Sequence, residues 1–449
     1  MRVLVVSNGF PPRGKWGTEF YTKELVLGLR SLFHDVAVLI PDRDSDNEAY
    51  GLEEVDEDGV PVYLLQSPPS TSKSFETSYT NADVEELFRT VLERWRPDLV
   101  HFTYLLWGLS VRMPVIAKDQ GIPSIVTVTD YGLLCHRGQM FDWRLQRCFG
   151  PHPPAVCARC VREPSIYDGS RARVTAKRAA VRTLARMGGM GIVVTEEELA
   201  LREKVVREAL EAVSHLIAPT RVVADTFRGY GVPEDKLTEL VYSFDDTHLR
   251  EARKETRSGV VTFGFLGQFT PHKGLAKLLA AVEVMEHRLP EAVEPWEVRI
   301  YGGKAGGRNL HYTERLFSHD RGPRVRVCPP FAPEDAHKIL ADLWAVVMPS
   351  EWDENAPLTA LQARAAGVPV IGSNVPGIAE VIEHGRHGLL FPPGNVEAMA
   401  NAMREVVLGR MVRVEEPGLP VEMEEHLECI EGIYRSALGR SGRISGHVA

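Results

Sequence analysis

The chain has 449 residues, of which 44% are hydrophobic and 25% charged, the balance of a soluble globular protein with two or three domains. A formal net charge of -9 argues against bulk attraction to nucleic acid. No apolar run approaches the roughly 20 residues that cross a bilayer, and the short apolar stretch after Met1 and Arg2 predicts a strand and not a signal peptide. We therefore expect a cytoplasmic protein.

The first expected unit is a strand at residues 3–6, a glycine-bearing loop, and a helix that ends near residue 32. Gly17 lets the backbone approach a ligand closely, and the amides that follow it would face an anion at the start of the helix. Glycine loops after strands are also common structural turns, so this unit alone leaves phosphate binding open.

The next stretch alternates strands and helices. We expect strands at 36–40, 60–65 and 97–101, a helix at 83–95, and an acidic solvated loop at 41–59. His101 ends its strand, where it either contacts a ligand or is a hydrogen-bonded core histidine.

A carboxylate follows the strand expected at 125–129. This strand delivers Asp130 to the edge where doubly wound sheets hold their sites. The Asp130 side chain either accepts a hydrogen bond from a ligand hydroxyl or caps the following turn, and the sequence leaves both roles open.

Four cysteines lie close together at Cys135, Cys148, Cys157 and Cys160. Four thiolates suit tetrahedral zinc, and a metal would order residues 137–161, which are rich in proline and have little apolar periodicity. The alternative is four free cysteines or a disulfide in a surface excursion. Clustered thiols in a reduced compartment bind metal more often than they pair, so we predict a structural zinc.

A basic amphipathic helix is expected at 171–187, which contains six arginines and lysines and no acidic residue. Such a helix lies on an anionic membrane or finds an acidic partner within the chain. The run Glu196 to Glu198 is the nearest candidate partner.

The second half begins after a linker expected at 242–256. A strand at 261–266 leads through a loop into a helix that begins near Leu275, and Lys273 lies at the mouth of this turn. An ammonium group at that position neutralises an anion. Further strands are expected at 296–301 and 324–328.

The stretch 345–383 predicts a βαβ unit. A strand at 345–348 is followed by a polar loop that contains Glu354, a helix at 358–366, and a second strand that begins at Val370. The loop opens onto a helix N-terminus, which attracts anions. Beyond it we expect a hairpin-like loop at 385–393, helices at 395–408 and 422–438, and a disordered tail.

The segment Glu354-Asn355-Ala356-Pro357-Leu358, followed by Ala363, Ala365-Ala366-Gly367 and Pro369-Val370, resembles the acidic signature of glycosyltransferase family 4. The resemblance extends over nearly the whole chain. It implies an α/β protein of the GT-B fold, with two Rossmann-like doubly wound domains facing a cleft and a C-terminal helix that crosses back to the first domain. We expect an acceptor-binding domain at 1–245 with a Cys-containing insertion at 135–161, a donor-binding domain at 246–425, and a crossover helix with a flexible tail at 426–449.

The resemblance also implies an activity. The family transfers a sugar from a UDP- or GDP-sugar to an acceptor hydroxyl with retained configuration and without a catalytic metal. The acceptor is a saccharide, a lipid-linked molecule or a small molecule, so peripheral contact of 171–187 with the inner face of a membrane stays open. By this resemblance Lys273 stabilises the leaving diphosphate, Glu354 positions the donor sugar, and Asp130 meets the acceptor. The other residues that the resemblance places at the nucleotide sugar are Gly17, Gly267, Gln268, Asn355, Ala356, Pro357, Leu358 and Gln362.

Three positions depart from the family pattern. Thr129 stands where many relatives have histidine, Gln268 leaves the site without a second cation, and Gln362 replaces the second glutamate of the signature. An amide oxygen at Gln362 can still accept a hydrogen bond from a ribose hydroxyl. Two alternatives remain: a sugar-nucleotide epimerase of the same architecture, and a donor-binding protein without turnover.

Overall fold

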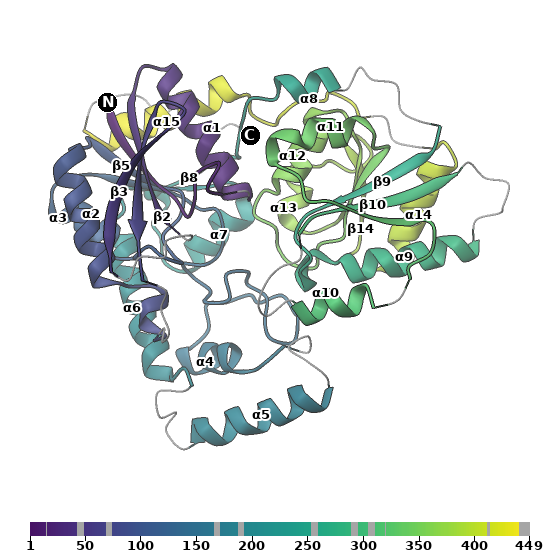
Figure 1. The fold of residues 1–449 in the computed structure, drawn as a ribbon, viewed down its shortest axis with the longest axis horizontal. Coiled ribbons are helices and arrows are strands. Elements are labelled where there is room, and N and C mark those ends of the chain that lie inside the picture. The colour runs from purple at the N-terminus through teal and green to yellow at the C-terminus, as the bar shows by residue number, and fades with distance from the viewer. Residues whose placement is uncertain are drawn as a thin grey trace.

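The computed structural model describes residues 1–14, 16–42, 49–68, 74–165, 171–186, 193–252, 259–288, 295–303, 310–318, 320–410 and 414–439. Within these residues the chain forms two sheets, each flanked by helices (Figure 1). The α/β class and the doubly wound arrangement expected from the sequence are confirmed. The expected tail from residue 440 onward, and residues 253–256 of the expected linker, lie outside the described residues.

The first sheet has eight strands in the order β3-β4-β2-β1-β5-β6-β7-β8. Its strands are β1 Arg2–Val6, β2 Asp35–Asp42, β3 Gly51–Glu57, β4 Val60–Gln66, β5 Leu99–Phe102, β6 Ser124–Thr127, β7 His215–Ala218 and β8 Leu237–Glu239. The central strands are apolar and fully buried because helices cover both faces of a parallel sheet.

One expectation in this half is wrong. Residues 51–57 of the expected acidic loop form β3, which pairs antiparallel with β4 at the edge of the sheet. Its side chains are mostly exposed or half-buried, so burial does not require apolar residues there. Acidic side chains on an edge strand also discourage pairing with a second chain, which explains the loop-like composition.

The second sheet has six parallel strands in the order β11-β10-β9-β12-β13-β14. They are β9 Val261–Leu266, β10 Trp296–Tyr301, β11 Val325–Cys328, β12 Ala345–Met348, β13 Val370–Ser373 and β14 Gly388–Phe391. The hairpin-like loop expected at 385–393 is wrong, because β14 pairs parallel with β13. Strands β12 and β13 pair parallel around one helix, which confirms the expected βαβ unit.

Helices connect and cover both sheets. In the first half they are α1 Gly17–Ser31, α2 Ala82–Trp95, α3 Met113–Asp119, α4 Pro154–Arg162, α5 Arg171–Arg186, α6 Glu196–Ala212 and α7 Arg221–Gly229. In the second half they are α8 Thr247–Ala252, α9 Leu275–Arg288, α10 Leu310–Leu316, α11 Ala336–Ala341, α12 Leu358–Ala365, α13 Pro376–Ala379, α14 Val396–Val407 and α15 Met423–Ala437. Short 3-10 turns include η3 Pro271–Lys273. In the described part of the chain, no helix is long and apolar enough to cross a bilayer.

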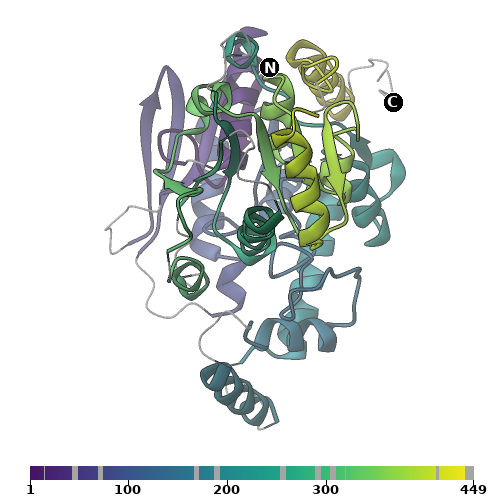
Figure 2. The same cartoon turned by 90° about the vertical axis from the view of Figure 1, so that its right-hand side faces the viewer.

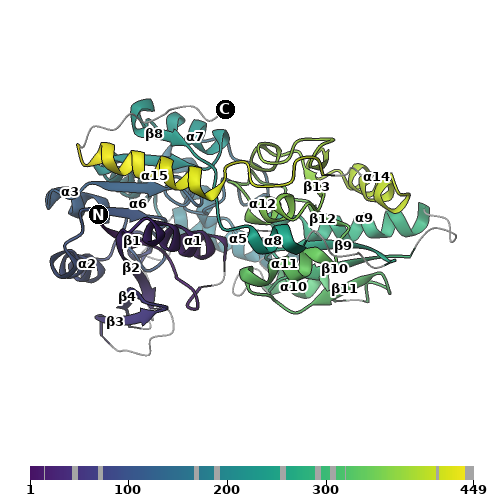
Figure 3. The same ribbon diagram turned by 90° about the horizontal axis from the view of Figure 1, so that it is seen from above.

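The last helix, α15, returns to the first sheet, as expected (Figure 3). The Tyr434 hydroxyl lies 2.5 Å from His101 Nδ1, and His426 Nε2 lies 3.1 Å from the Tyr21 hydroxyl. His101 is fully buried and also lies 2.7 Å from the Thr127 hydroxyl. His101 is therefore a core histidine that docks α15, and burial lowers its pKa to about 3.

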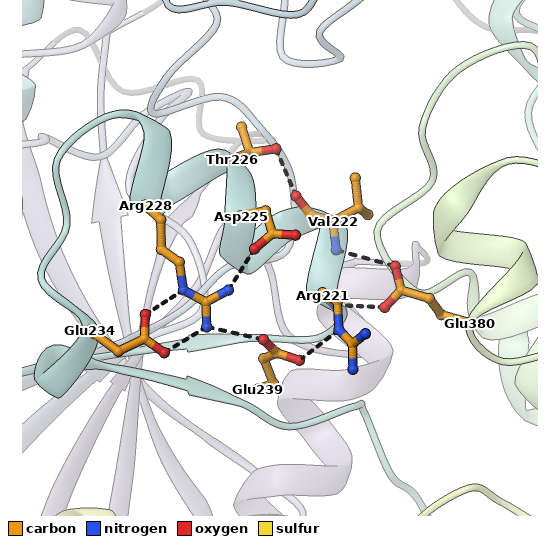
Figure 4. Close-up of polar contacts among 8 residues, drawn as sticks. All are labelled: Arg221, Val222, Asp225, Thr226, Arg228, Glu234, Glu239 and Glu380. Carbon is orange, nitrogen blue, oxygen red and sulfur yellow. Dashed lines mark hydrogen bonds and ion pairs between the residues drawn. The ribbon is translucent and has the colours of Figure 1, made fainter. Parts of the chain in front are cut away.

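The two halves also meet through polar contacts at α7. Glu380 directly follows α13, and its carboxylate accepts the backbone amides of Arg221 and Val222 at 2.5 and 3.1 Å (Figure 4). These amides open α7, so a side chain of the second half caps a helix of the first. Farther along α7, Arg228 pairs with carboxylates of the first half only: Asp225, Glu234 and Glu239.

Candidate active site

A cleft of about 690 Å³ lies between the two halves. Its walls include the loops after β9 and β10 and the strand end at Pro349, together with the start of α1 and residues after β6. These loops follow the carboxyl ends of parallel strands, where doubly wound sheets hold ligands. Every predicted catalytic or donor-contacting residue lines this one cleft: Gly17, Asp130, Gly267, Gln268, Lys273, Glu354, Asn355, Ala356, Pro357, Leu358 and Gln362.

A buried ion pair lies at the centre of the second-half wall. Lys273 Nζ donates to both Glu354 oxygens, at 2.8 and 2.9 Å, and the Ser350 hydroxyl donates to Oε1 at 2.6 Å. Glu354 is only 3% exposed, whereas the Lys273 side chain is 26% exposed. Both side chains line the cleft, and the Lys273 side chain is the more accessible of the two. Ser350 lies two residues after the end of β12, a position where parallel sheets place ligand contacts, so the sequence could have identified it.

Two glycines allow this pair to form. Gly274 has φ +72, and a Cβ there would lie 1.8 Å from the Pro349 carbonyl oxygen. A Cβ at Gly377 would lie 1.7 Å from the Glu354 carbonyl oxygen. Only glycine fits at these two positions, so Gly274 lets the turn η3 that carries Lys273 lie against Pro349, and Gly377 lets α13 lie against the Glu354 backbone.

The Trp352 side chain packs beside Lys273. Its indole ring lies 5.2 Å from Lys273 Nζ and packs edge-on against His272 with ring centroids 5.0 Å apart. It also meets Tyr131 of the first half at 6.3 Å. Burial lowers the pKa of His272 to about 3, so its imidazole is neutral and serves as a packing group.

Asp353 points away from the cleft, although it precedes Glu354. Its carboxylate forms an ion pair with Arg147 of the Cys-containing insertion, and the Asp353 side chain is 12% exposed. Phe141 of the same insertion packs edge-on against His272. The insertion therefore touches both loops that carry the Lys273–Glu354 pair, and no local pattern around Arg147 signals this contact.

Asp130 makes the turn contact that the sequence allowed. Its Oδ1 accepts the Gly132 amide at 2.7 Å, and its Oδ2 accepts the Tyr104 hydroxyl at 3.1 Å. Burial raises the pKa of its carboxyl group. Thr129 donates its hydroxyl to the Thr103 carbonyl and so does not take the place of an imidazole in the cleft. Contact of Asp130 with an acceptor stays a prediction.

The start of α1 differs from an open phosphate site. The Trp16 amide donates to the carboxylate of Glu19, at 3.2 Å, and Glu19 is 1% exposed. The first turn of α1 therefore already holds an anion. A Cβ at Gly17 would lie 3.2 Å from Leu358 Cδ1, so this glycine lets the first turn pack against the start of α12.

Gln362 lies on α12 and is 7% exposed. Both Gln362 and Gln268, which follows β9, line the cleft. The ends of β10 and β11 also reach this cleft. Gly302, Gly303, Pro330 and Phe331 bring those ends into the cleft wall. A Cβ at Gly302 would lie 1.9 Å from the Gly267 carbonyl oxygen, so the loops that follow β9 and β10 are in close contact. The contacts of these groups with a nucleotide stay predictions.

The four cysteines of the insertion line one cavity but do not form a metal site. Cys135, Cys148, Cys157 and Cys160 are all free. Among the described residues, no group of three or more His, Cys, Asp or Glu side chains is arranged to hold a metal ion. Burial and the neighbouring thiols raise the pKa of Cys157 to about 11, which favours the protonated thiol. The geometry therefore does not support the predicted zinc.

The basic helix α5 lies at the end of the molecule farthest from α15 (Figures 1 and 2). Arg178 and Arg182 pair with Glu163, which is 3% exposed, and Arg178 also stacks over Trp143 at 4.6 Å. Glu163 is thus an acidic partner of this helix within the chain, and the run at 196–198 opens α6. Membrane contact of this helix stays a prediction, and Met187 lies outside the described residues.

Two family descriptions match the chain. Residues 17–196 match the family described as "Glycosyl transferase 4-like domain", and residues 260–408 match the one described as "Glycosyl transferases group 1". A D-inositol 3-phosphate glycosyltransferase of Nocardioides sp. is 28% identical over 218 residues, 44% of this chain and 47% of that protein. The chain spans about half the length of the curated relatives it matches.

Solved structures resemble the whole chain. Sucrose-phosphate synthase from Thermosynechococcus elongatus matches 98% of this chain and 100% of its own, with a TM-score of 0.63 and 16% identity. Anabaena HepE in complex with UDP and glucose matches 97% of this chain and 99% of its own, with a TM-score of 0.62 and 14% identity. At such identities the likeness concerns the fold alone, and it confirms the expected GT-B architecture.

Proposed function

Since this chain belongs to the group 1 glycosyltransferases, we propose that it transfers a sugar from a nucleoside diphosphate sugar to an acceptor hydroxyl with retained anomeric configuration. The observation that carries the proposal is the pair of Lys273 and Glu354 in the wall of the interdomain cleft. An ammonium group has three donors, and Glu354 takes two of them. The third is left for the oxygens of a diphosphate.

The donor lies along the second half of the cleft in this proposal. Its diphosphate meets Lys273 and the amides at the start of α12, where a helix N-terminus favours an anion. Its ribose hydroxyls meet Gln362, and its base lies between Gly302 and Phe331, where the ends of β10 and β11 reach the cleft. The complex of Anabaena HepE with UDP and glucose supports UDP-glucose as the first donor to test.

The reaction exchanges one bond at the anomeric carbon and moves one proton. The acceptor oxygen bonds to the anomeric carbon, and the bond from that carbon to the diphosphate oxygen breaks with its electron pair going to the diphosphate. The departing oxygen takes the proton of the acceptor hydroxyl. Lys273 offsets the charge that develops on the leaving group, and Glu354 holds donor sugar hydroxyls as positive charge grows at the anomeric carbon. No step in this scheme needs a metal ion.

A panel of UDP-, GDP- and ADP-sugars tests the proposal. The protein is incubated with each donor, with and without EDTA, and the free nucleoside diphosphate and the remaining donor are quantified. We expect slow donor hydrolysis that EDTA does not change. An isomerised donor would instead indicate an epimerase, and a thermal shift without any turnover would indicate a binding protein.

A further inference from the structure

A second cavity, of about 520 Å³, lies beneath the Cys-containing insertion. Insertion residues form one wall of this cavity, and residues of α6 form another. Arg137 lines both this cavity and the interdomain cleft, so the two spaces adjoin at that residue. Neither the family match nor the proposed donor site assigns a ligand to this second cavity.

Much of the cavity wall is apolar. The apolar and aromatic side chains that line it include Leu133, Met140, Phe141, Trp143, Phe149, Val156, Leu199, Val206, Leu210 and Tyr230. Two of them remain open to solvent, because Phe149 is 74% exposed and Val156 is 49% exposed. A ligand with an apolar body would cover these side chains, and that burial favours binding.

A buried cation stands in the same wall. Arg202 of α6 is 4% exposed, donates one N–H to the Gly132 carbonyl oxygen, and lies over the Tyr79 ring at 5.9 Å. Its Nε–H has no hydrogen-bond partner, and in the described part of the chain no carboxylate lies within ion-pair distance of its guanidinium. A buried charge without a counter-ion is costly, and a bound anion would offset that cost.

The acceptor residue of the proposed reaction is nearby. The Asp130 carboxylate accepts the Gly132 amide, and Arg202 donates to the carbonyl oxygen of the same residue, so both side chains lie beside Gly132. A molecule whose anionic group meets Arg202 can therefore extend past Arg137 toward Asp130 and the Lys273–Glu354 pair.

We propose that this cavity binds the acceptor substrate, and that the acceptor is an amphipathic anion with an apolar body and a phosphate or carboxylate group that pairs with Arg202. The apolar body lies against Phe149 and Val156, and the reacting hydroxyl reaches the cleft beside Arg137. This inference rests on the proposed transferase function, whereas its test measures binding without turnover.

The test uses n-octyl phosphate below its micellar concentration as a probe, with calorimetric titration of the full chain. Inorganic phosphate supplies the anion alone, and 1-octanol supplies the apolar body alone. We expect octyl phosphate to bind at least tenfold more tightly than either, and Arg202→Met to weaken its binding at least tenfold. Arg89→Met, which removes an exposed arginine of α2 that lies outside the cavity wall, is the matched control and should bind like wild type.

Several outcomes would overturn the inference. They are no binding of octyl phosphate to the wild type, equal binding to Arg202→Met, or equal binding of one of the two partial probes. If Arg202→Met does not fold, Phe149→Ala replaces it, and it should weaken the binding of octyl phosphate without changing the binding of inorganic phosphate. Binding of UDP is measured on the same samples, so failure of the donor site is recognised separately from failure of the acceptor cavity.

Discussion

At the scale of single residues, variants of Glu354 and Lys273 distinguish a loss of catalysis from a loss of nucleotide binding. Glu354→Gln keeps the shape of the side chain and removes its charge, so it should lower kcat roughly a hundredfold, about 2.7 kcal/mol, and leave UDP affinity nearly unchanged. Steady-state kinetics and titration with UDP measure the two effects. Glu351→Gln is the control, because Glu351 lies in the same loop but outside the cleft wall. Equal damage at both positions would indicate disruption of the loop.

Lys273→Met should lower kcat more than Glu354→Gln does. No second cation stands at Gln268, so loss of the ammonium should raise the activation free energy by about 3–4 kcal/mol. Lys277→Met removes a lysine of α9 outside the cleft wall and should keep wild-type kcat. Retention of more than about a tenth of kcat by Lys273→Met would show that another group stabilises the leaving diphosphate.

At the scale of elements, the Cys-containing insertion contacts the loop that carries Glu354, through the ion pair of Arg147 with Asp353. Removing either partner leaves the other charge half-buried and unpaired, so Arg147→Met and Asp353→Asn should each raise the KM for the donor. The KM of the double variant should be no higher than that of either single variant. The coupling free energy from this cycle should fall at about 0.5–3 kcal/mol. The exposed pair of Glu86 and Arg89 is the control and should show a coupling near zero. Additive effects at Arg147 and Asp353 would rule out the contact.

The docking of α15 should weaken in acid. Burial lowers the pKa of His101 to about 3 and that of His426 to about 4, whereas the pKa of a histidine in the unfolded chain is about 6.5. Below pH 6.5 the unfolded chain binds protons that the folded chain excludes, so the free energy of unfolding falls as the pH falls. Each of the two histidines should lower the free energy of unfolding by about 1.4 kcal/mol when the pH falls from 7.5 to 5.5.

Urea denaturation at the two pH values measures this loss. His426→Gln should show about 1.4 kcal/mol less pH dependence than the wild type, because an amide takes up no proton. An unchanged slope in His426→Gln would mean that this histidine titrates alike in both states.

At the scale of the whole molecule, the Glu380 cap ties the two halves together. Glu380→Ala leaves two amides of α7 without acceptors, which costs about 0.5–2 kcal/mol at a helix start. Because the contact crosses between halves, we expect a larger radius of gyration in solution scattering with the folding of each half preserved. Glu383→Ala, which removes a carboxylate that pairs with Arg386 of the same half, should leave the radius unchanged. An unchanged radius in Glu380→Ala would show that the cap does not hold the halves together.

The sequence by itself determined the order of the elements and the residues of the cleft. Apolar runs such as residues 3–6, 261–266 and 345–348 predicted buried parallel strands, because a strand covered on both faces must be apolar throughout. The position of each loop after such a strand then placed Gly17, Lys273 and Glu354 at the same kind of edge. Periodicity failed at β3 and β14, which lie at sheet edges where burial constrains composition least.

Only the tertiary structure decided which side chains meet. Lys273 and Glu354 are 81 residues apart and join because two glycines let three loops approach. Arg147 pairs with Asp353 of the other half, Arg178 pairs with Glu163, and four closely spaced cysteines line a cavity without forming a metal site. Pairing of this kind depends on how distant backbones pack, and the spacing of residues along the chain carries no information about that packing.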